Sequence, residues 1–157
     1  MRLSTLVKGT AGTAVVALGA LAVAPQASAV TPTAASVEVD CGYFYGSGKA
    51  TLEAEQNGDE ATLRFTTPVA WAHHSFPENE IASTLTLTTA SGEEVTLTGQ
   101  SNPAWVRLGQ PFDSGPLTGT VPVGEELEFT SITAVFSGTV VVNCTALAPQ
   151  EPEPFVF

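Results

Sequence analysis

The densest group of metal-binding or acid–base side chains lies in the segment WAHHSFPENE, residues 71–80. It contains both histidines of the chain, His73 and His74, together with Glu78 and Glu80. Imidazole and carboxylate groups bind zinc and related ions, but adjacent histidines on a strand point to opposite faces. The spacing also matches no H-E-x-x-H signature. We therefore predict no metal and no cofactor, and keep a metal-dependent enzyme at His73 and His74 as an alternative hypothesis.

Four aromatic residues are candidates for ligand binding by ring stacking: Tyr43, Tyr45, Trp71 and Trp105. The run Tyr43–Tyr45 lies between two glycines, so at least one of its rings is expected to be exposed. Stacking on a sugar requires two or more coplanar exposed rings, whereas most aromatic side chains serve core packing. A carbohydrate- or small-ligand-binding module is therefore a second alternative hypothesis.

Nucleophilic and acid–base catalysis find little support in the sequence. Ser75 follows His74, but adjacency in sequence does not create a catalytic triad, and no G-x-S-x-G motif is present. The carboxylate pairs Glu93-Glu94 and Glu125-Glu126 fall in polar turns, where solvated surface is their ordinary role. We predict that the protein is not an enzyme.

The first 29 residues have the features of a secretory signal peptide. Arg2 and Lys8 form a positive start, an apolar run covers Ala11–Ala24, and Ala27-Ser28-Ala29 is a small-residue cleavage site. The apolar run is about 14 residues long, shorter than the roughly 20 that a membrane-spanning helix needs. We therefore predict a secreted, extracellular protein without a membrane span, either released or held loosely at the cell envelope.

Acidic residues dominate the charge of the chain. There are 16 acidic and 5 basic residues, a net charge of −11. Loss of Arg2 and Lys8 with the signal peptide would leave 3 basic residues against the same 16 acidic ones, hence −13. Such a surface repels nucleic acid and anionic lipid, so neither is an expected partner.

Short runs of alternating apolar and polar residues fill the segment 36–146, with turn signals between them. Asn57-Gly58 separates two such runs and Ser91-Gly92 another two, which predicts two hairpins. Further strands are expected at 104–108, 117–123, 127–136 and 140–144. Seven to nine antiparallel strands at this spacing predict a β-sandwich, with a barrel as the alternative.

The segments that flank these strands have a different composition. Residues 30–35 form a short N-terminal leader, and residues 147–157 form a tail rich in proline and glutamate. Proline removes backbone donors, so we expect this tail outside the sheet. Its last residues, Phe155-Val156-Phe157, are expected to fray, although they also have the composition to pair with a sheet edge.

The two cysteines fall on the expected first and last strands. Cys41 continues the inward set of Val37 and Val39, and Cys144 continues that of Val140 and Val142. Both sulfur atoms should point into the core, and two cysteines in an exported protein favour a disulfide. We predict one structural disulfide between Cys41 and Cys144.

The second half of the chain resembles small secreted immunoglobulin-like β-sandwich domains of Gram-positive actinobacteria. The resemblance rests on PAWVRLGQP, LTGTVPVG, ELEFTSITAVF and GTVVVNC, and it extends over about residues 36–146. It implies an immunoglobulin-like β-sandwich and an extracellular location, and it assigns no catalytic residues. Together with the residues above, it predicts a monomeric, non-enzymatic extracellular or envelope-associated module that binds an unknown protein or polysaccharide.

The signal-peptide interpretation predicts a defined product. Cleavage after Ala29 leaves 128 of the 157 residues, beginning at Val30. Intact mass spectrometry of the secreted protein should give this chain, two hydrogens lighter than its reduced form. A product that retains Arg2 and Lys8 would contradict the interpretation.

Overall fold

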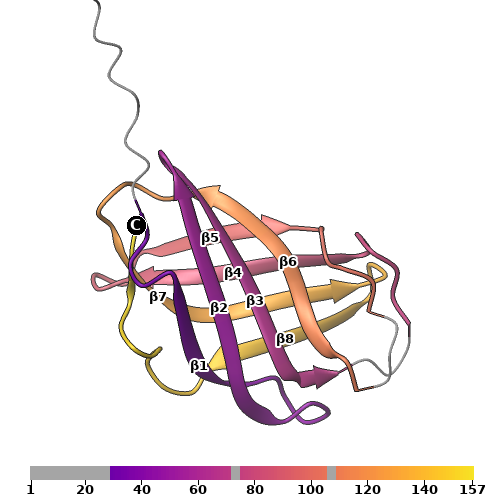
Figure 1. Cartoon of the computed structure of the whole chain (residues 1–157). Coiled ribbons are helices and arrows are strands. Elements are labelled where there is room, and N and C mark those ends of the chain that lie inside the picture. The colour runs from indigo at the N-terminus through magenta and orange to yellow at the C-terminus, as the bar shows by residue number, and fades with distance from the viewer. Residues whose placement is uncertain (1–28, 72–74, 106–108) are drawn as a thin grey trace, which may run out of the picture.

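A computed structural model describes residues 29–71, 75–105 and 109–157, and its secondary structure there is β-strand (Figure 1). The nine strands in chain order are β1 Ala34–Asp40, β2 Ser47–Asn57, β3 Glu60–Trp71, β4 Ile81–Thr89, β5 Glu94–Gly99, β6 Pro111–Thr120, β7 Glu126–Phe136, β8 Val140–Ala146 and β9 Phe155–Val156. In these ranges the chain contains no helix long and apolar enough to cross a membrane.

The strands close into an antiparallel barrel of eight strands, with β9 added outside the ring. The order is β4-β5-β6-β3-β2-β1-β8-β7, and β7 pairs again with β4. The all-β antiparallel class and the strand number predicted from the sequence are confirmed. The immunoglobulin-like sandwich is not confirmed, because pairing between β4 and β7 and across both seams closes the sheet on itself.

The sequence pattern was typical of a sandwich because the barrel consists of two layers that are joined by few residue pairs. We call the two places where the layers join the seams. Strands β1, β2, β3 and β6 form one layer, which crosses the layer of β4, β5, β7 and β8 steeply (Figure 1). The layers join where Thr98 of β5 pairs with Thr118 of β6, and where Val39 and Asp40 of β1 pair with β8. Alternation along a strand specifies one inward face in either architecture, so it does not reveal these joins.

The turn signals located the hairpins correctly. Asn57 pairs with Glu60 across a two-residue turn, β4 and β5 form the second hairpin, and Ser137-Gly138 connects β7 to β8. The other boundaries differ. The strand expected at 117–123 is β6 and starts six residues earlier, at Pro111. A further strand was expected at 104–108. There, Trp105 forms a single bridge with Phe76, and 106–108 lie outside the described residues.

An aromatic cluster fills one part of the barrel interior. Trp105 packs against Phe76, Phe112 and Phe136, with ring centroids between 5.3 and 5.9 Å away. Its indole N–H donates to the carbonyl of Gln110 at 2.7 Å, which satisfies the one polar atom of the ring. An eight-stranded barrel is just wide enough for inward side chains to fill it, and this cluster does so here.

The C-terminal tail is part of the sheet, which corrects the expectation that it lies outside. Phe155 and Val156 of β9 pair with Leu127 and Glu126 of β7, and Val156 exchanges two backbone hydrogen bonds with Thr31. The end of the chain therefore lies beside its described start (Figure 1). The expected fraying is wrong because the rings of Phe155 and Phe157 are fully buried, 5.9 Å apart, and hold the tail in place.

The buried amide of Gln150 fixes the approach to β9. Its side-chain oxygen accepts the N–H of Phe129 at 2.9 Å, and its Nε2 donates to the carbonyl of Glu153 at 2.8 Å. Ser36 and Glu151 also form a two-way backbone bridge. The residues beyond 146 are thus tied to β1 and β7, although three prolines prevent a long strand.

This anchoring predicts that Phe155→Ala destabilises the protein by about 3–5 kcal/mol, the usual cost of removing a fully buried phenylalanine ring. Val156→Thr is the matched control, since Val156 is exposed and threonine retains the β-branched shape. Urea unfolding of both variants measures the difference. Equal free energies of unfolding for Phe155→Ala and the wild type would show that the tail contributes nothing to stability.

Candidate functional site

The turn between β1 and β2 is the most conspicuous feature of the described surface. Gly42 and Gly46 adopt φ of 83° and 75°, values that glycine reaches without strain. The N–H groups of Cys41 and Gly46 donate to the carbonyls of Gly46 and Gly42, at 2.9 and 2.7 Å. Gly42 also donates its N–H to Asp40 Oδ1 at 2.9 Å. These hydrogen bonds hold a compact turn, residues 42–46, which we call the aromatic tip.

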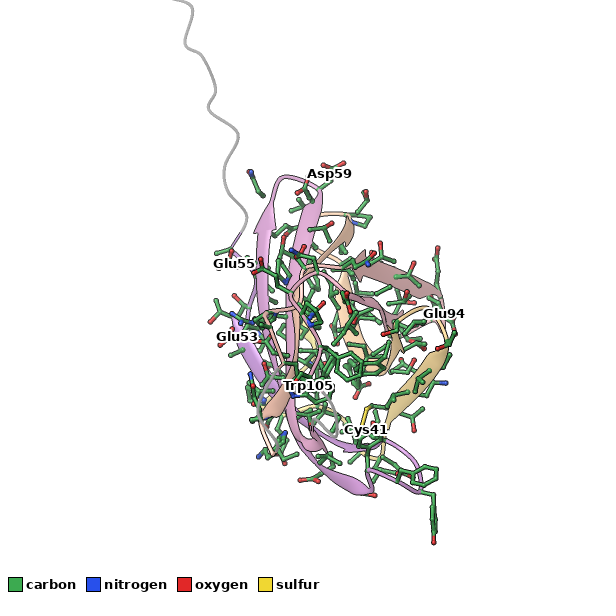
Figure 2. All side chains as sticks on the ribbon, turned by 90° about the vertical axis from the view of Figure 1, so that its right-hand side faces the viewer. Cys41, Glu53, Glu55, Asp59, Glu94 and Trp105 are labelled. Atoms are coloured by element: carbon green, nitrogen blue, oxygen red, sulfur yellow. A yellow bond between two sulfur atoms is a disulfide. The ribbon has the colours of Figure 1, made fainter. Side chains whose placement is uncertain are left out.

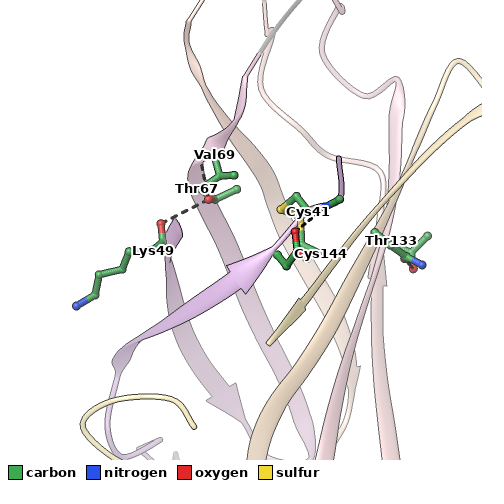
Figure 3. Close-up of a disulfide and its surroundings, with 9 residues drawn as sticks. Cys41, Lys49, Thr67, Val69, Thr133 and Cys144 are labelled. Carbon is green, nitrogen blue, oxygen red and sulfur yellow. Dashed lines mark hydrogen bonds between the residues drawn. A yellow bond between two sulfur atoms is a disulfide. The ribbon is translucent and has the colours of Figure 1, made fainter. Parts of the chain in front are cut away.

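A disulfide fixes the base of the aromatic tip. Cys41, directly after β1, is bonded to Cys144 of β8, at a sequence separation of 103 residues and with both side chains buried (Figure 3). The predicted pairing and the inward direction of both cysteines are therefore confirmed. Because β1 and β8 pair through only two residues, the disulfide holds this seam closed directly below the tip.

Tyr43 and Phe44 extend into solvent from the tip. Their exposed fractions are 97% and 84%, and the turn projects from the barrel beyond Cys41 (Figure 2). Their rings contact each other edge to face, with centroids 5.6 Å apart and planes at 81°. Two such rings offer apolar surface and a phenol group, but they do not form the coplanar platform that stacking on a sugar requires.

Tyr45, the third aromatic residue of the turn, is oriented toward the core and not toward solvent. It is half-buried and packs against the barrel core, and this burial raises the pKa of its phenol above the usual value of 10.0. Tyr45 therefore anchors the tip, and Phe44 takes its place as an exposed ring. The sequence contained one signal for this difference, since 43 and 44 are central in a turn bounded by Gly42 and Gly46.

The two tryptophans do not join Tyr43 in one surface. Trp105 is 3% exposed and belongs to the interior aromatic cluster, so it is not one of the exposed rings that stacking on a ligand requires. Its hydrophobic contacts inside the barrel outweigh any gain from exposure, since burial of so large a ring is strongly stabilising. Trp71 ends β3, but its side chain lies outside what the structure describes.

The structure describes two of the four candidate metal ligands. Glu78 and Glu80 are exposed on the loop before β4, and His73 and His74 lie outside the described residues. Elsewhere, in the ranges that the structure covers, no three histidine, cysteine or acidic side chains group closely enough to hold a metal ion.

Threonines cover much of the outer barrel surface. One row crosses five strands in register, from Thr133 of β7 through Thr84, Thr98 and Thr118 to Thr62 of β3. Threonine has a high β-propensity and its hydroxyl group suits a solvated sheet face. This row explains the outward polarity of the barrel and does not gather around the tip.

Comparison of the chain with protein-family models, with curated proteins and with solved structures gave no match. The arguments about function therefore depend on the geometry of this molecule alone.

The position of the disulfide predicts its effect on stability. Cys41→Ala/Cys144→Ala should lower the free energy of unfolding by about 2–5 kcal/mol, because a 103-residue loop is no longer closed. Urea unfolding of the wild type with a reductant is the matched control, since it removes the bond and retains both sulfur atoms. Unchanged stability in both cases would show that hydrogen bonds alone close the seam.

Proposed function

We propose that this protein is a secreted, non-enzymatic interaction module that binds a protein partner through Tyr43 and Phe44. One observation carries the proposal: two neighbouring aromatic rings are almost fully exposed on a turn that a disulfide and backbone hydrogen bonds hold in place. Aromatic residues are enriched in protein interfaces and supply much of their binding energy.

The cost of exposing these rings supports a binding role. Burying a large apolar side chain stabilises by about 1.5–3 kcal/mol, and neither ring gains this in the free protein. The neighbouring Tyr45 packs on the core, so the tip can bury an aromatic ring and still presents two to solvent. A rigid turn also loses little conformational freedom on binding.

A protein partner fits these rings better than a polysaccharide or a membrane. The edge-to-face arrangement gives no flat platform for sugar stacking, and Trp105 is unavailable inside the barrel. Aromatic tips can insert at membrane interfaces, but the chain carries 16 acidic against 5 basic residues, which opposes approach to anionic lipid.

An extracellular location agrees with the disulfide. Buried disulfides persist in oxidising compartments and are rare in reducing ones. The signal-peptide pattern of residues 1–29 supports export. Cleavage after Ala29 would also retain Val30, which is buried, and Thr31, which pairs with Val156, so the mature chain would keep both of these contacts.

Photo-crosslinking tests the proposal. A variant with p-benzoylphenylalanine at Phe44, added to cultures of the producing cells, should crosslink to a protein at the tip. The same photo-reactive residue at Val123 is the matched control, because Val123 is also exposed, at 61%, in the turn before β7. We expect a crosslinked band at position 44 that is absent at position 123.

A competition step makes the test specific. An excess of unlabelled wild type should abolish the band, and an excess of Tyr43→Ser/Phe44→Ser should not. If position 44 crosslinks no more than position 123, or if both competitors act equally, the tip is not the binding site.

A further inference from the structure

The edge of β8 remains open next to the aromatic tip. Val39 and Asp40 pair with Ala146 and Thr145, but β1 ends there because Cys41 directs its N–H to Gly46 within the turn. The β8 residues 140–143 therefore have register partners on β7 alone, among the residues that the structure describes. Within the described ranges, the barrel closure thus leaves a four-residue edge with no paired strand, about 13 Å long at the usual rise of a strand.

The hydrogen-bonding groups of this edge can be assigned from the pairing. Leu147 donates its N–H to Glu38 on β1, so every second residue before it directs its N–H and C=O to the same side. These residues include Asn143 and Val141, which lie beyond the last partner on β1. Two donors and two acceptors thus point to the open side, the pattern that an added strand would satisfy.

The open edge lacks the features that usually protect such strands. Natural edge strands carry lysines, prolines or inward charges that prevent pairing with another chain. Residues 140–143 are Val-Val-Val-Asn, and Val140 and Val141 are 56% and 60% exposed. The aromatic tip starts beside this edge, because the disulfide joins Cys41 to Cys144, the residue after Asn143.

From these observations we propose that the β8 edge binds an extended, basic segment of the partner as an additional β-strand, with Tyr43 and Phe44 contacting its side chains. The inference rests on the proposed function and names its partner chemistry. A basic segment is favoured because all 16 acidic residues belong to the described part of the chain, where Lys49 and Arg64 are the basic ones. A second copy would bring the same negative charge to the interface.

Amide hydrogen exchange of the intact mature protein tests the inference directly. The probe is the acetylated and amidated peptide Lys-Val-Lys-Val-Lys-Val, with Glu-Val-Glu-Val-Glu-Val as its charge-reversed control. The lysine peptide should slow exchange at Val141 and Asn143 by about tenfold or more, because each N–H gains a hydrogen bond. Val142, whose N–H already faces β7, should change little, and the glutamate peptide should have no effect at the same concentration.

The substitution Val141→Pro gives a second test. It removes one open-edge donor without removing a bond to β7, and proline is tolerated on the free side of an edge strand. Affinity for the lysine peptide should fall about tenfold or more, whereas Val141→Thr, which retains the N–H, should bind like the wild type. Thermal unfolding of both variants checks that they fold, and the exchange test needs no variant.

Three outcomes would overturn the inference. These are no protection at Val141 and Asn143 at millimolar peptide, equal protection by both peptides, or a wild-type dimer in sedimentation that Val141→Pro abolishes, which would make a second copy the occupant. The proposed function is judged separately. If excess unlabelled Val141→Pro abolishes the crosslinked band as the wild type does, and Tyr43→Ser/Phe44→Ser does not, the module binds by its tip and strand addition is wrong.

Discussion

The covalent link between Cys41 and Cys144 is the constraint on which the rest of the structure depends. It joins the first and last strands of the eight-stranded ring where only two residue pairs hold them together. Without it, the open side of β8 could extend along the whole strand, and the turn after β1 would lose its fixed base. The same bond therefore closes the seam between β1 and β8 (Figure 3) and fixes the base of the turn that carries the exposed aromatic rings.

The C-terminal tail is held to the start of the described chain by hydrophobic burial and not by a covalent bond. Phe155 and Phe157 are buried beside Val30, so the two ends of the described chain hold each other. A barrel whose two layers are joined by few residue pairs needs further contacts, because strand pairing adds little stability where the layers meet. The disulfide reinforces the seam between β1 and β8, and the C-terminal tail ties β7 to the segment before β1.

The sequence predicted the parts that local patterns determine. Alternation located most strands, Asn57-Gly58 located its turn, and the inward phase of Cys41 and Cys144 identified the disulfide. Closure into a barrel was not predictable, since it depends on pairing between β4 and β7 and across the seams, far apart in the chain. Of the candidate aromatic residues, Tyr43 is exposed and Trp105 is buried in the interior cluster. Phe44 and not Tyr45 is the second exposed ring of the tip, because ring direction in a five-residue turn depends on tertiary contacts.

The geometry of closure also explains why the exposed rings and the open edge of β8 occur at the same end of the molecule. A closed barrel satisfies the backbone groups of its strands internally, so it has an open edge only where the ring is incompletely paired. Here the strand that should cover β8 turns away at Gly42, and the turn that it makes carries the exposed rings. One deviation of the backbone therefore creates both the uncovered edge and the aromatic surface beside it. The two features arise together from the same five residues, which is why they lie side by side.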